Sequence, residues 1–490
     1  MAVSEARSSL DRRSVWAAVC LIAAAAFITT NLPWNLEDYD QAKQAFTSLE
    51  MVQQGHWLYQ HTPNGWVATK PPLVGWISAA LFTITRSWDI AWRLPSLAAA
   101  LALTWFVGRA AFRAEGRAAA LLALAAVSLN LFAPRLATLV RTDMPLALIT
   151  FLIGAQIWEK LRTGERWSTR DRWLHFALLT AAMVIKGPII YVFLLPGLVA
   201  FEFYRRRRSE MKISAWCGAW PWLVSFLVFV IWVAVGIHTV PEFLEHVVIR
   251  EFGGRFEGTH RAQPIYFYLP HLVYRFAPWS ILLVVFGALI RRKTLDGNGG
   301  RSSRLSPETT WLVVWGLGGI LAMSFIPSKR VDRIFPVVPP LALLLAAQWA
   351  ALRSDARSSS RADLLATIAV CIACLVTGGY TVAKVVPAFR RQRDAFAVFG
   401  HEVCDQLAAQ PLRLDVIGGE DEGMLLYLRK TEFTELPDAL AHWRAHEIDA
   451  VVAPDETLPD LRAALPDIGR VRFSGAAGNH HRRYVFLTRR

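Results

Sequence analysis

Charged residues are scarce in this chain of 490 residues. They make up 19% of it, whereas apolar residues make up 54% and the mean hydropathy is +0.32. This composition is too apolar for an ordinary soluble enzyme and indicates an integral membrane protein. Lys and Arg together number 53 against 39 acidic residues. In a membrane protein such an excess marks cytoplasmic loops, so we expect the lipid bilayer, and no nucleic acid, as a partner.

Cysteines and nucleotide-binding motifs are also few. Of the five cysteines, four lie in apolar runs, so even the Cys371 and Cys374 pair predicts helix packing and not a disulfide framework, redox centre or metal site. The sequence around Gly418 and Gly419 lacks the spacing of a dinucleotide-binding loop. It predicts a plain turn.

The apolar segments predict eleven membrane crossings. The first, residues 15–30, follows Arg7, Arg12 and Arg13; this fits a signal peptide or an uncleaved span, and we favour the span with a cytoplasmic N-terminus. Residues 73–84 would form about 18 Å of helix against a hydrocarbon core of roughly 30 Å, so they predict an interfacial or re-entrant helix. The other crossings are expected at 94–111, 118–132, 144–158, twice between 172 and 205 with a turn at 186–188, and at 215–238, 276–290, 311–326, 335–352 and 363–383.

This register places the basic clusters near residues 160–172, 205–208 and 291–293 in the cytoplasm. It predicts a transmembrane domain over 1–383, with a first extracytoplasmic loop at 32–93. A fourth loop, 239–275, is expected to order over bound substrate. Residues 384–490 alternate short β-like segments with amphipathic stretches, which predicts a small extracytoplasmic α/β domain.

Charged residues from distant parts of the sequence meet at the outer membrane face in this topology. Carboxylates among fixed cations indicate chemistry on an anionic, membrane-embedded ligand. A carboxylate can take a proton from an attacking hydroxyl, and Lys or Arg can stabilise a departing phosphate. Four of these charges have a simpler explanation when each is taken singly. Each would be an interfacial charge that reaches the membrane surface or pairs with a neighbour, without a role in the chemistry: Asp38, Arg135, Arg330 and Asp332. The other members of the set are Asp40, Lys70, Arg141, Asp143, Lys186, Lys329 and Arg333.

The motifs around these charges resemble a known family. The first loop contains Asp40-Gln41-Ala42, Glu50-Met51, Gly55-His56-Trp57, and Lys70-Pro71-Pro72-Leu73 with Trp76. In the same order follow Arg93-Leu94-Pro95-Ser96, Arg141-x-Asp143, Lys186-Gly187-Pro188, His260 with Pro264, Tyr266-x-Tyr268, Pro278-Trp279, and Ser328-Lys329 before Pro336. Over residues 15–350 the chain resembles the lipid A aminoarabinose transferases and protein O-mannosyltransferases, which are polyprenyl-phosphate-sugar glycosyltransferases of the GT-C fold.

The resemblance implies roles for individual residues. Asp40 matches the catalytic carboxylate, Lys70 the lysine that contacts the donor phosphate, and Asp143 the second-loop acid that positions the acceptor or Lys70. Lys186 and Lys329 sit in motifs expected to contact phosphate, and His260, Tyr266 and Tyr268 belong to the substrate loop. Two positions depart from the pattern. Gln41 stands where many relatives have Glu, and Arg333 stands where the aminoarabinose transferases have a tyrosine; arginine can bind the donor phosphate bidentately.

The resemblance predicts an inverting glycosyltransferase of the bacterial inner membrane. It would move a monosaccharide from a polyprenyl-phosphate donor to an extracytoplasmic acceptor, which is lipid A or lipopolysaccharide, a glycan or a protein. Asp40 would deprotonate or orient the acceptor, and a phosphate acceptor would need no general base. No cofactor is required. The carboxylates at 37–40 could hold a divalent ion, but nearby cations supply the same electrostatics, and the spacing of His246, His260 and His271 does not match a zinc site.

Two alternatives remain open at this point. A lipid flippase or transporter would also have a cationic cavity, but it predicts an internal repeat and charges at the midplane of the bilayer. The sequence halves show no convincing similarity, and the charges gather at one face. The second alternative is a catalytically silent relative that only binds a polyprenyl lipid, or a partner through the C-terminal domain. The presence of both Asp40 and Lys70 favours an enzyme.

Overall fold

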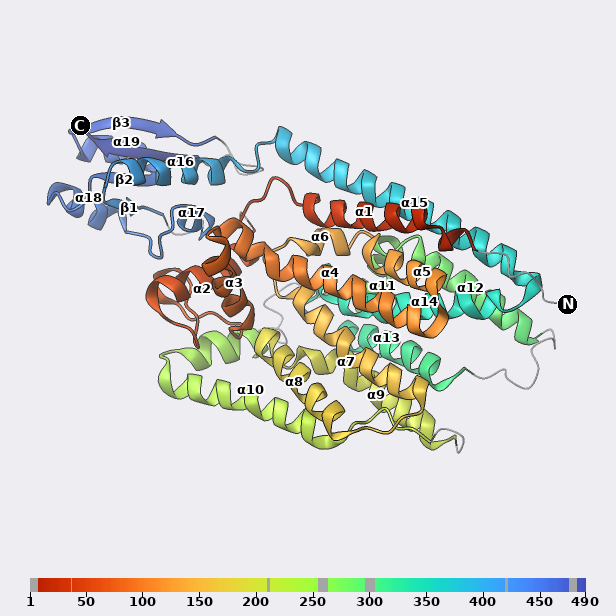
Figure 1. The fold of residues 1–490 in the computed structure, drawn as a ribbon. Helices are drawn as coiled ribbons and strands as arrows, with labels where there is room; N and C mark the ends of the chain where they lie inside the picture. The colour runs from red at the N-terminus through yellow and green to blue at the C-terminus, as the bar shows by residue number, and fades with distance from the viewer. Residues whose placement is uncertain are drawn as a thin grey trace.

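The computed structural model describes residues 8–36, 38–208, 212–253, 263–295, 305–418, 422–475 and 483–490. It consists of a long helical bundle and a small C-terminal sheet (Figure 1). Each of the eleven apolar segments expected to cross the membrane coincides with a helix. These helices are α1 (Arg13–Thr29), α4 (Trp88–Glu115), α5 (Arg117–Ser128), α7 (Asp143–Thr163), α8 (Thr169–Lys186), α9 (Ile189–Arg206), α10 (Ala219–Thr239), α12 (Trp279–Leu295), α13 (Pro307–Phe325), α14 (Val338–Arg353) and α15 (Ala356–Arg390).

The chain is a multi-pass membrane protein. Within the described residues, six helices are long and apolar enough to cross a bilayer: α4, α7, α10, α13, the segment formed by η5 (Val331–Val337) and α14, and α15. The pair α11 (Tyr268–Arg275) and α12, bent by 94°, would make a seventh span. Since α1 and α5 are apolar but shorter, and α8 and α9 do not pass the same test, the total of eleven crossings stays a prediction.

The first loop folds into two helices that precede α4. Helix α2 (Tyr39–Gln54) ends at Gly55, whose φ of 86° closes the helix in a left-handed conformation. Helix α3 (Leu73–Thr85) has thirteen residues, or about 20 Å, so it is too short to span a hydrocarbon core of roughly 30 Å. It packs against α2 and α4, which confirms the short helix that the sequence predicts.

Small residues let the bundle helices approach one another closely. A Cβ on Gly197 of α9 would lie 2.8 Å from the backbone of Trp315, and one on Gly318 would lie 2.7 Å from the Gly197 nitrogen. The α9 and α13 backbones are therefore in contact, as is common where dispersion and not hydrophobicity drives helix association. Trp311 donates its indole N–H to the carbonyl of Gly154 at 2.9 Å.

The C-terminal region is a four-stranded sheet with helices, in the order β1-β2-β4-β3. Strands β1 and β2 are parallel and the other pairs are antiparallel. The sequence predicts β-like segments at 414–418, 448–452, 470–473 and 483–488, and each of them overlaps one of these strands. The elements are α16 (Ala395–Ala409), β1 (Leu414–Val416), α17 (Glu422–Tyr427), α18 (Leu436–Arg444), β2 (Ala450–Pro454), α19 (Leu458–Ala464), β3 (Ile468–Phe473) and β4 (Tyr484–Arg489). Because α15 continues to Arg390, past the expected boundary at 383, the division into two domains stays a prediction.

The sheet region lies on the first loop. Figure 1 shows it at the same end of the bundle as α2 and α3. Phe46 of α2 and Trp92 of α4 share one buried apolar cluster with Tyr427 and Phe486. The Tyr427 hydroxyl also accepts a hydrogen bond from the Leu36 backbone N–H at 2.7 Å. The C-terminal region therefore packs against the segment that leads into α2 and stabilises it.

An ion pair across this contact predicts a pH-dependent stability. His401 of α16 lies 3.3 Å from Asp89 of α4, and this hydrogen bond raises the pKa of His401. A raised pKa in the folded state means that the protonated histidine stabilises the fold, and this contribution is lost as pH rises from about 6 past the raised pKa. We expect His401→Gln to remove a pH-dependent stability of less than about 1 kcal/mol, because both groups are partly exposed.

The measurement is thermal unfolding of wild type and His401→Gln in detergent across this pH range. His238→Gln serves as the control, because His238 is exposed and belongs to no ion pair among the described residues. An identical pH profile in wild type and His401→Gln would contradict the prediction.

Candidate functional site

The first predicted carboxylate, Asp40, lies in the first turn of α2. Asp38 caps this helix, since its side chain accepts a hydrogen bond from the Asp40 backbone N–H at 3.1 Å. Two acids at a helix N-terminus are stabilised by the unsatisfied N–H groups there. The cap fixes where α2 begins, and thereby where the Asp40 carboxylate is presented.

Arginines from two other segments converge on these acids. Arg330 is ion-paired with Asp40 Oδ2, and an Arg141 Nη2 atom lies 2.5 Å from Asp38 Oδ2 and 3.7 Å from Asp40 Oδ2. Asp332 pairs with Arg141 at 3.5 Å and with Arg135 at 3.3 Å. We refer to these six residues as the arginine–carboxylate network.

The sequence placed Arg330 among the charges of one membrane face but assigned it no role of its own. Taken by itself it is an interfacial charge beside the expected Lys329, and only the fold brings it to Asp40, 290 residues away in the sequence. Its position in the same basic loop as Lys329 and Arg333 is the one signal that the sequence offers.

A second ion pair joins Asp143 and Lys186. Lys186 Nζ lies 2.5 Å from Asp143 Oδ1, and about a tenth of each side chain is exposed. Asp143 is the first residue of α7 and Lys186 the last residue of α8, so each charge sits at the helix end whose dipole favours it. Gly187 follows with a φ of 70°, which forms the predicted turn into α9.

Five of the residues to which the resemblance assigns a role line one cavity of about 70 Å³. The lining consists of Asp40, Lys70, Arg141, Thr142, Asp143, Lys186, Arg330, Asp332 and Arg333. Five of these are cations and three are acids, which leaves an excess of two positive charges. The cavity therefore favours an anion.

A narrow crevice opens beside this cavity. It shares Asp143, Lys186 and Arg333 with the cavity, and its remaining lining is apolar: Leu146, Ile189, Phe193, Met323, Ile326 and Pro336. An anionic group joined to an apolar chain would match the two surfaces together.

The other predicted residues do not belong to this lining. Lys329 Nζ donates to the carbonyl of Gln263 at 2.9 Å, and partial burial lowers the pKa of Lys329. Tyr268 is fully buried in α11, whereas Tyr266 is 69% exposed. His260 lies outside the described residues. The substrate-loop roles of these residues stay predictions.

A larger polar cavity, of about 400 Å³, lies next to the arginine–carboxylate network. Its cations are Arg93, Arg135, Lys384 and Arg393, and Asp38 is the one acid in the lining among the residues that the structure describes. The guanidinium of Arg93 stacks on Trp34, 4.9 Å from the ring centroid. The side chain of Arg135 joins the two cavities through its pair with Asp332.

No family model matches the chain. Among curated proteins it is 28% identical over 356 residues to undecaprenyl phosphate-alpha-4-amino-4-deoxy-L-arabinose arabinosyl transferase 1 of Sodalis glossinidius, covering 69% of this chain and 60% of that protein. It is 27% identical over 330 residues to the transferase of the same name, without the number, from Shewanella sediminis, covering 64% and 56%. The chain thus spans about 60% of the length of these relatives.

Two solved structures share the fold. The crystal structure of ArnT from Cupriavidus metallidurans bound to undecaprenyl phosphate superposes with a TM-score of 0.72 at 17% identity, covering 97% of both chains. The archaeal oligosaccharyltransferase AglB from Archaeoglobus fulgidus, in complex with an inhibitory peptide and a dolichol-phosphate, gives 0.53 at 13% identity, covering 96% of this chain and 74% of that one. The chain has the GT-C fold, as the sequence motifs predict.

Because the Asp143–Lys186 pair is buried, removal of one partner should cause a large loss of stability. Lys186→Met leaves the Asp143 carboxylate buried without its partner and should lower the free energy of unfolding by about 3 kcal/mol or more. Adding Asp143→Leu should recover part of this loss, because no unpaired charge then remains. Chemical or thermal unfolding in detergent measures both variants.

The exposed pair Arg413–Asp449 provides the matched control, and Arg413→Met should change stability little. If Lys186→Met lowered the free energy of unfolding as little as Arg413→Met does, the fold would not depend on the Asp143–Lys186 pair.

Proposed function

We propose that this protein is a glycosyltransferase of the bacterial inner membrane that transfers a monosaccharide from a polyprenyl-phosphate donor to an acceptor outside the cytoplasm. The observation that carries this proposal is the positively charged cavity that continues into an apolar crevice. Relatives named undecaprenyl phosphate-aminoarabinose arabinosyl transferases support it. We place the N-terminus in the cytoplasm and residues 384–490 on the outer side, with the site.

The donor phosphate would lie between Lys70, Lys186 and Arg333. Lys186 and Arg333 line both the cavity and the crevice, so a phosphate held there would extend its polyprenyl chain along the apolar crevice. In the reaction the bond between the anomeric carbon and the phosphate oxygen breaks, and a bond to the acceptor oxygen forms on the opposite face. The cations stabilise the charge that remains on the polyprenyl phosphate.

Asp143 would keep the Lys186 ammonium in place during this step. Its ion pair orients the Nζ atom toward the junction of cavity and crevice. A charge that is already oriented needs no rearrangement when the phosphate departs, and this preorganisation is the main source of electrostatic catalysis.

Asp40 would orient the acceptor. Its carboxylate is paired with Arg330 and lies near Arg141, and a carboxylate that is stabilised by two guanidinium groups is a weak base. It is suited to positioning and electrostatic work more than to the deprotonation of a hydroxyl. This favours an acceptor oxygen that is already anionic, such as a phosphate.

The larger cavity provides a place for such an acceptor. Its four cations face a single described acid, and it adjoins the network that holds Asp40. Among lipid A or lipopolysaccharide, a glycan and a protein, we therefore propose a phosphorylated glycolipid of the lipid A class. Its phosphate would bind near Arg135, Lys384 and Arg393.

The test of the transferase uses proteoliposomes with a panel of polyprenyl-phosphate sugars and membrane acceptors. Wild type should release free polyprenyl phosphate, measured by mass spectrometry, and Asp40→Asn should release it about a hundredfold more slowly. Asp438→Asn, in α18 of the C-terminal region, is the control and should match wild type. Equal rates for Asp40→Asn and wild type would remove Asp40 from the chemistry. Movement of lipid between leaflets without release would instead support a flippase.

The acceptor cavity has its own test. The double variant Lys384→Gln/Arg393→Gln should raise KM for a phosphorylated acceptor about tenfold while leaving KM for the donor unchanged. Arg391→Gln, an exposed neighbour outside the cavity lining, is the control. If the double variant instead raises KM for the donor alone, the phosphate of the acceptor binds elsewhere.

A further inference from the structure

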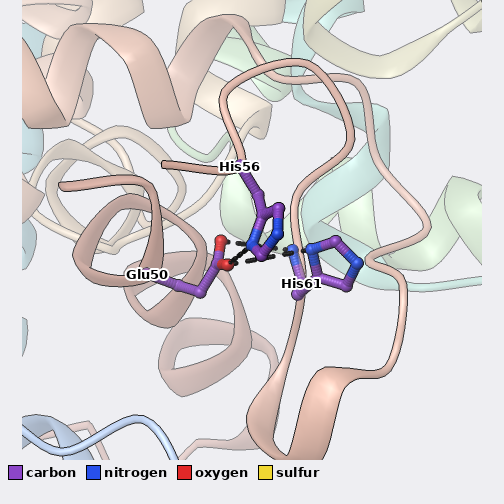
Figure 2. A group of neighbouring side chains, drawn as sticks. All are labelled: Glu50, His56 and His61. Atoms are coloured by element: carbon purple, nitrogen blue, oxygen red, sulfur yellow. Dashed lines mark hydrogen bonds and ion pairs between the residues drawn. The ribbon is translucent and has the colours of Figure 1, made fainter. Parts of the chain in front are cut away.

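A separate group of titratable side chains lies in the first loop, outside the lining of both cavities. Glu50 belongs to the last part of α2, His56 follows the Gly55 turn, and His61 lies in the segment that leads toward Lys70. One ligand atom from each of Glu50, His56 and His61 lies within 4.8 Å of the other two. Figure 2 shows both imidazole rings beside the Glu50 carboxylate.

The two histidines approach the same oxygen through the same kind of nitrogen. His56 Nδ1 is paired with Glu50 Oε1, and His61 Nδ1 lies 3.7 Å from that oxygen. The two ring centroids are 4.2 Å apart. The carboxylate and both imidazole rings are thus close enough to share one ligand between them.

Glu50 is buried and His61 is partly buried, and burying their polar atoms costs free energy unless a further partner binds them. Glu50 is only 2% exposed, and its burial raises the pKa of the carboxyl group. Burial also lowers the pKa of His61, and the nearby His56 lowers it further. His61 Nδ1 is buried and has no hydrogen-bond partner among the described residues. A neutral imidazole with an unused nitrogen is the form that binds a metal ion, and a metal ion would satisfy that nitrogen.

We propose that Glu50, His56 and His61 bind one Zn²⁺ ion through the carboxylate and the two Nδ1 atoms. Two imidazoles and one carboxylate are a ligand set that suits zinc, with a water in the fourth position. Water can reach that position because the side chain of His56 is 48% exposed. The ion would lie apart from the cavity that holds Asp40, and it would join the end of α2 to the segment that follows it.

The ion would hold the segment that presents Lys70. His61 pairs with Val67 in an isolated bridge, and the Ala68 backbone N–H donates to the Gln60 carbonyl at 2.7 Å. The Gln60 side chain in turn donates to the Lys70 carbonyl at 3.0 Å. Anchoring His61 to Glu50 therefore ties this turn to α2, the helix that also carries Asp40. This consequence rests on the proposed function, whereas metal binding does not.

The experiment is metal titration of the full-length protein in detergent after treatment with a chelator. Calorimetry with Zn²⁺ alone should give one ion per chain, and Co²⁺ in its place should show the visible absorption bands of a tetrahedral N/O site. Glu50→Gln and His61→Ala should each weaken binding at least tenfold. Zn²⁺ should raise the melting temperature of wild type by several degrees and that of these variants much less.

The matched control is His246→Ala. His246 also has a carboxylate beside it, Glu242 at 2.9 Å, but it belongs to no described three-ligand group. It should bind Zn²⁺ as wild type does. Absence of binding by wild type, or equal binding by wild type, Glu50→Gln and His61→Ala, would overturn the proposal.

A second variant and a transfer assay separate loss of the metal site from loss of the fold and from loss of the transferase activity. If His61→Ala does not fold, His56→Asn replaces a half-exposed ligand and should lose the Co²⁺ bands while keeping its fold. In the transfer assay, removal of Zn²⁺ should raise KM for the donor several-fold with kcat little changed. Zinc binding without any sugar transfer would refute the proposed function and leave the metal site standing.

Discussion

The pairing of charges among apolar helices is the constraint on which the rest of this structure depends. An isolated charge is costly where water is scarce, so the carboxylates and cations near these helix ends must pair with one another. Asp332 contacts Arg135 and Arg141, and Arg141 in turn contacts Asp38 and Asp40. The network thereby joins the first loop, the α6 (Ala133–Ala137) to α7 connection and the segment after α13. The position of the cavity follows from this pairing.

Helix ends provide the framework for these pairs. The α2 N-terminus presents Asp38 and Asp40, and the N-terminus of α7 and the C-terminus of α8 present Asp143 and Lys186. Each charge has the sign that its helix dipole favours, so the helices and the ion pairs stabilise the same arrangement. The C-terminal sheet region packs on α2 through a shared apolar cluster. It thus supports the site without lining the small cavity.

Much of this arrangement could be predicted from the sequence. Apolar runs marked eleven segments that the structure shows as helices, and short β-like segments marked the four strands. The motifs that resemble the aminoarabinose transferases selected Asp40, Lys70, Asp143, Lys186 and Arg333, which the fold brings to one cavity. Lys329, from the same motifs, contacts the Gln263 carbonyl outside that lining. A motif identifies a residue but does not state which way its side chain points.

The sequence by itself determined which segments are helices and on which face of the membrane the charges were expected, because hydrophobicity and charge are local properties of the chain. Only the tertiary structure decided the partners. Arg330 reaches Asp40 across 290 residues, and Glu50 faces both His56 and His61 because Gly55 turns the chain back at the end of α2. Such pairs depend on how helices and loops pack in three dimensions, and no spacing along the sequence encodes that packing directly.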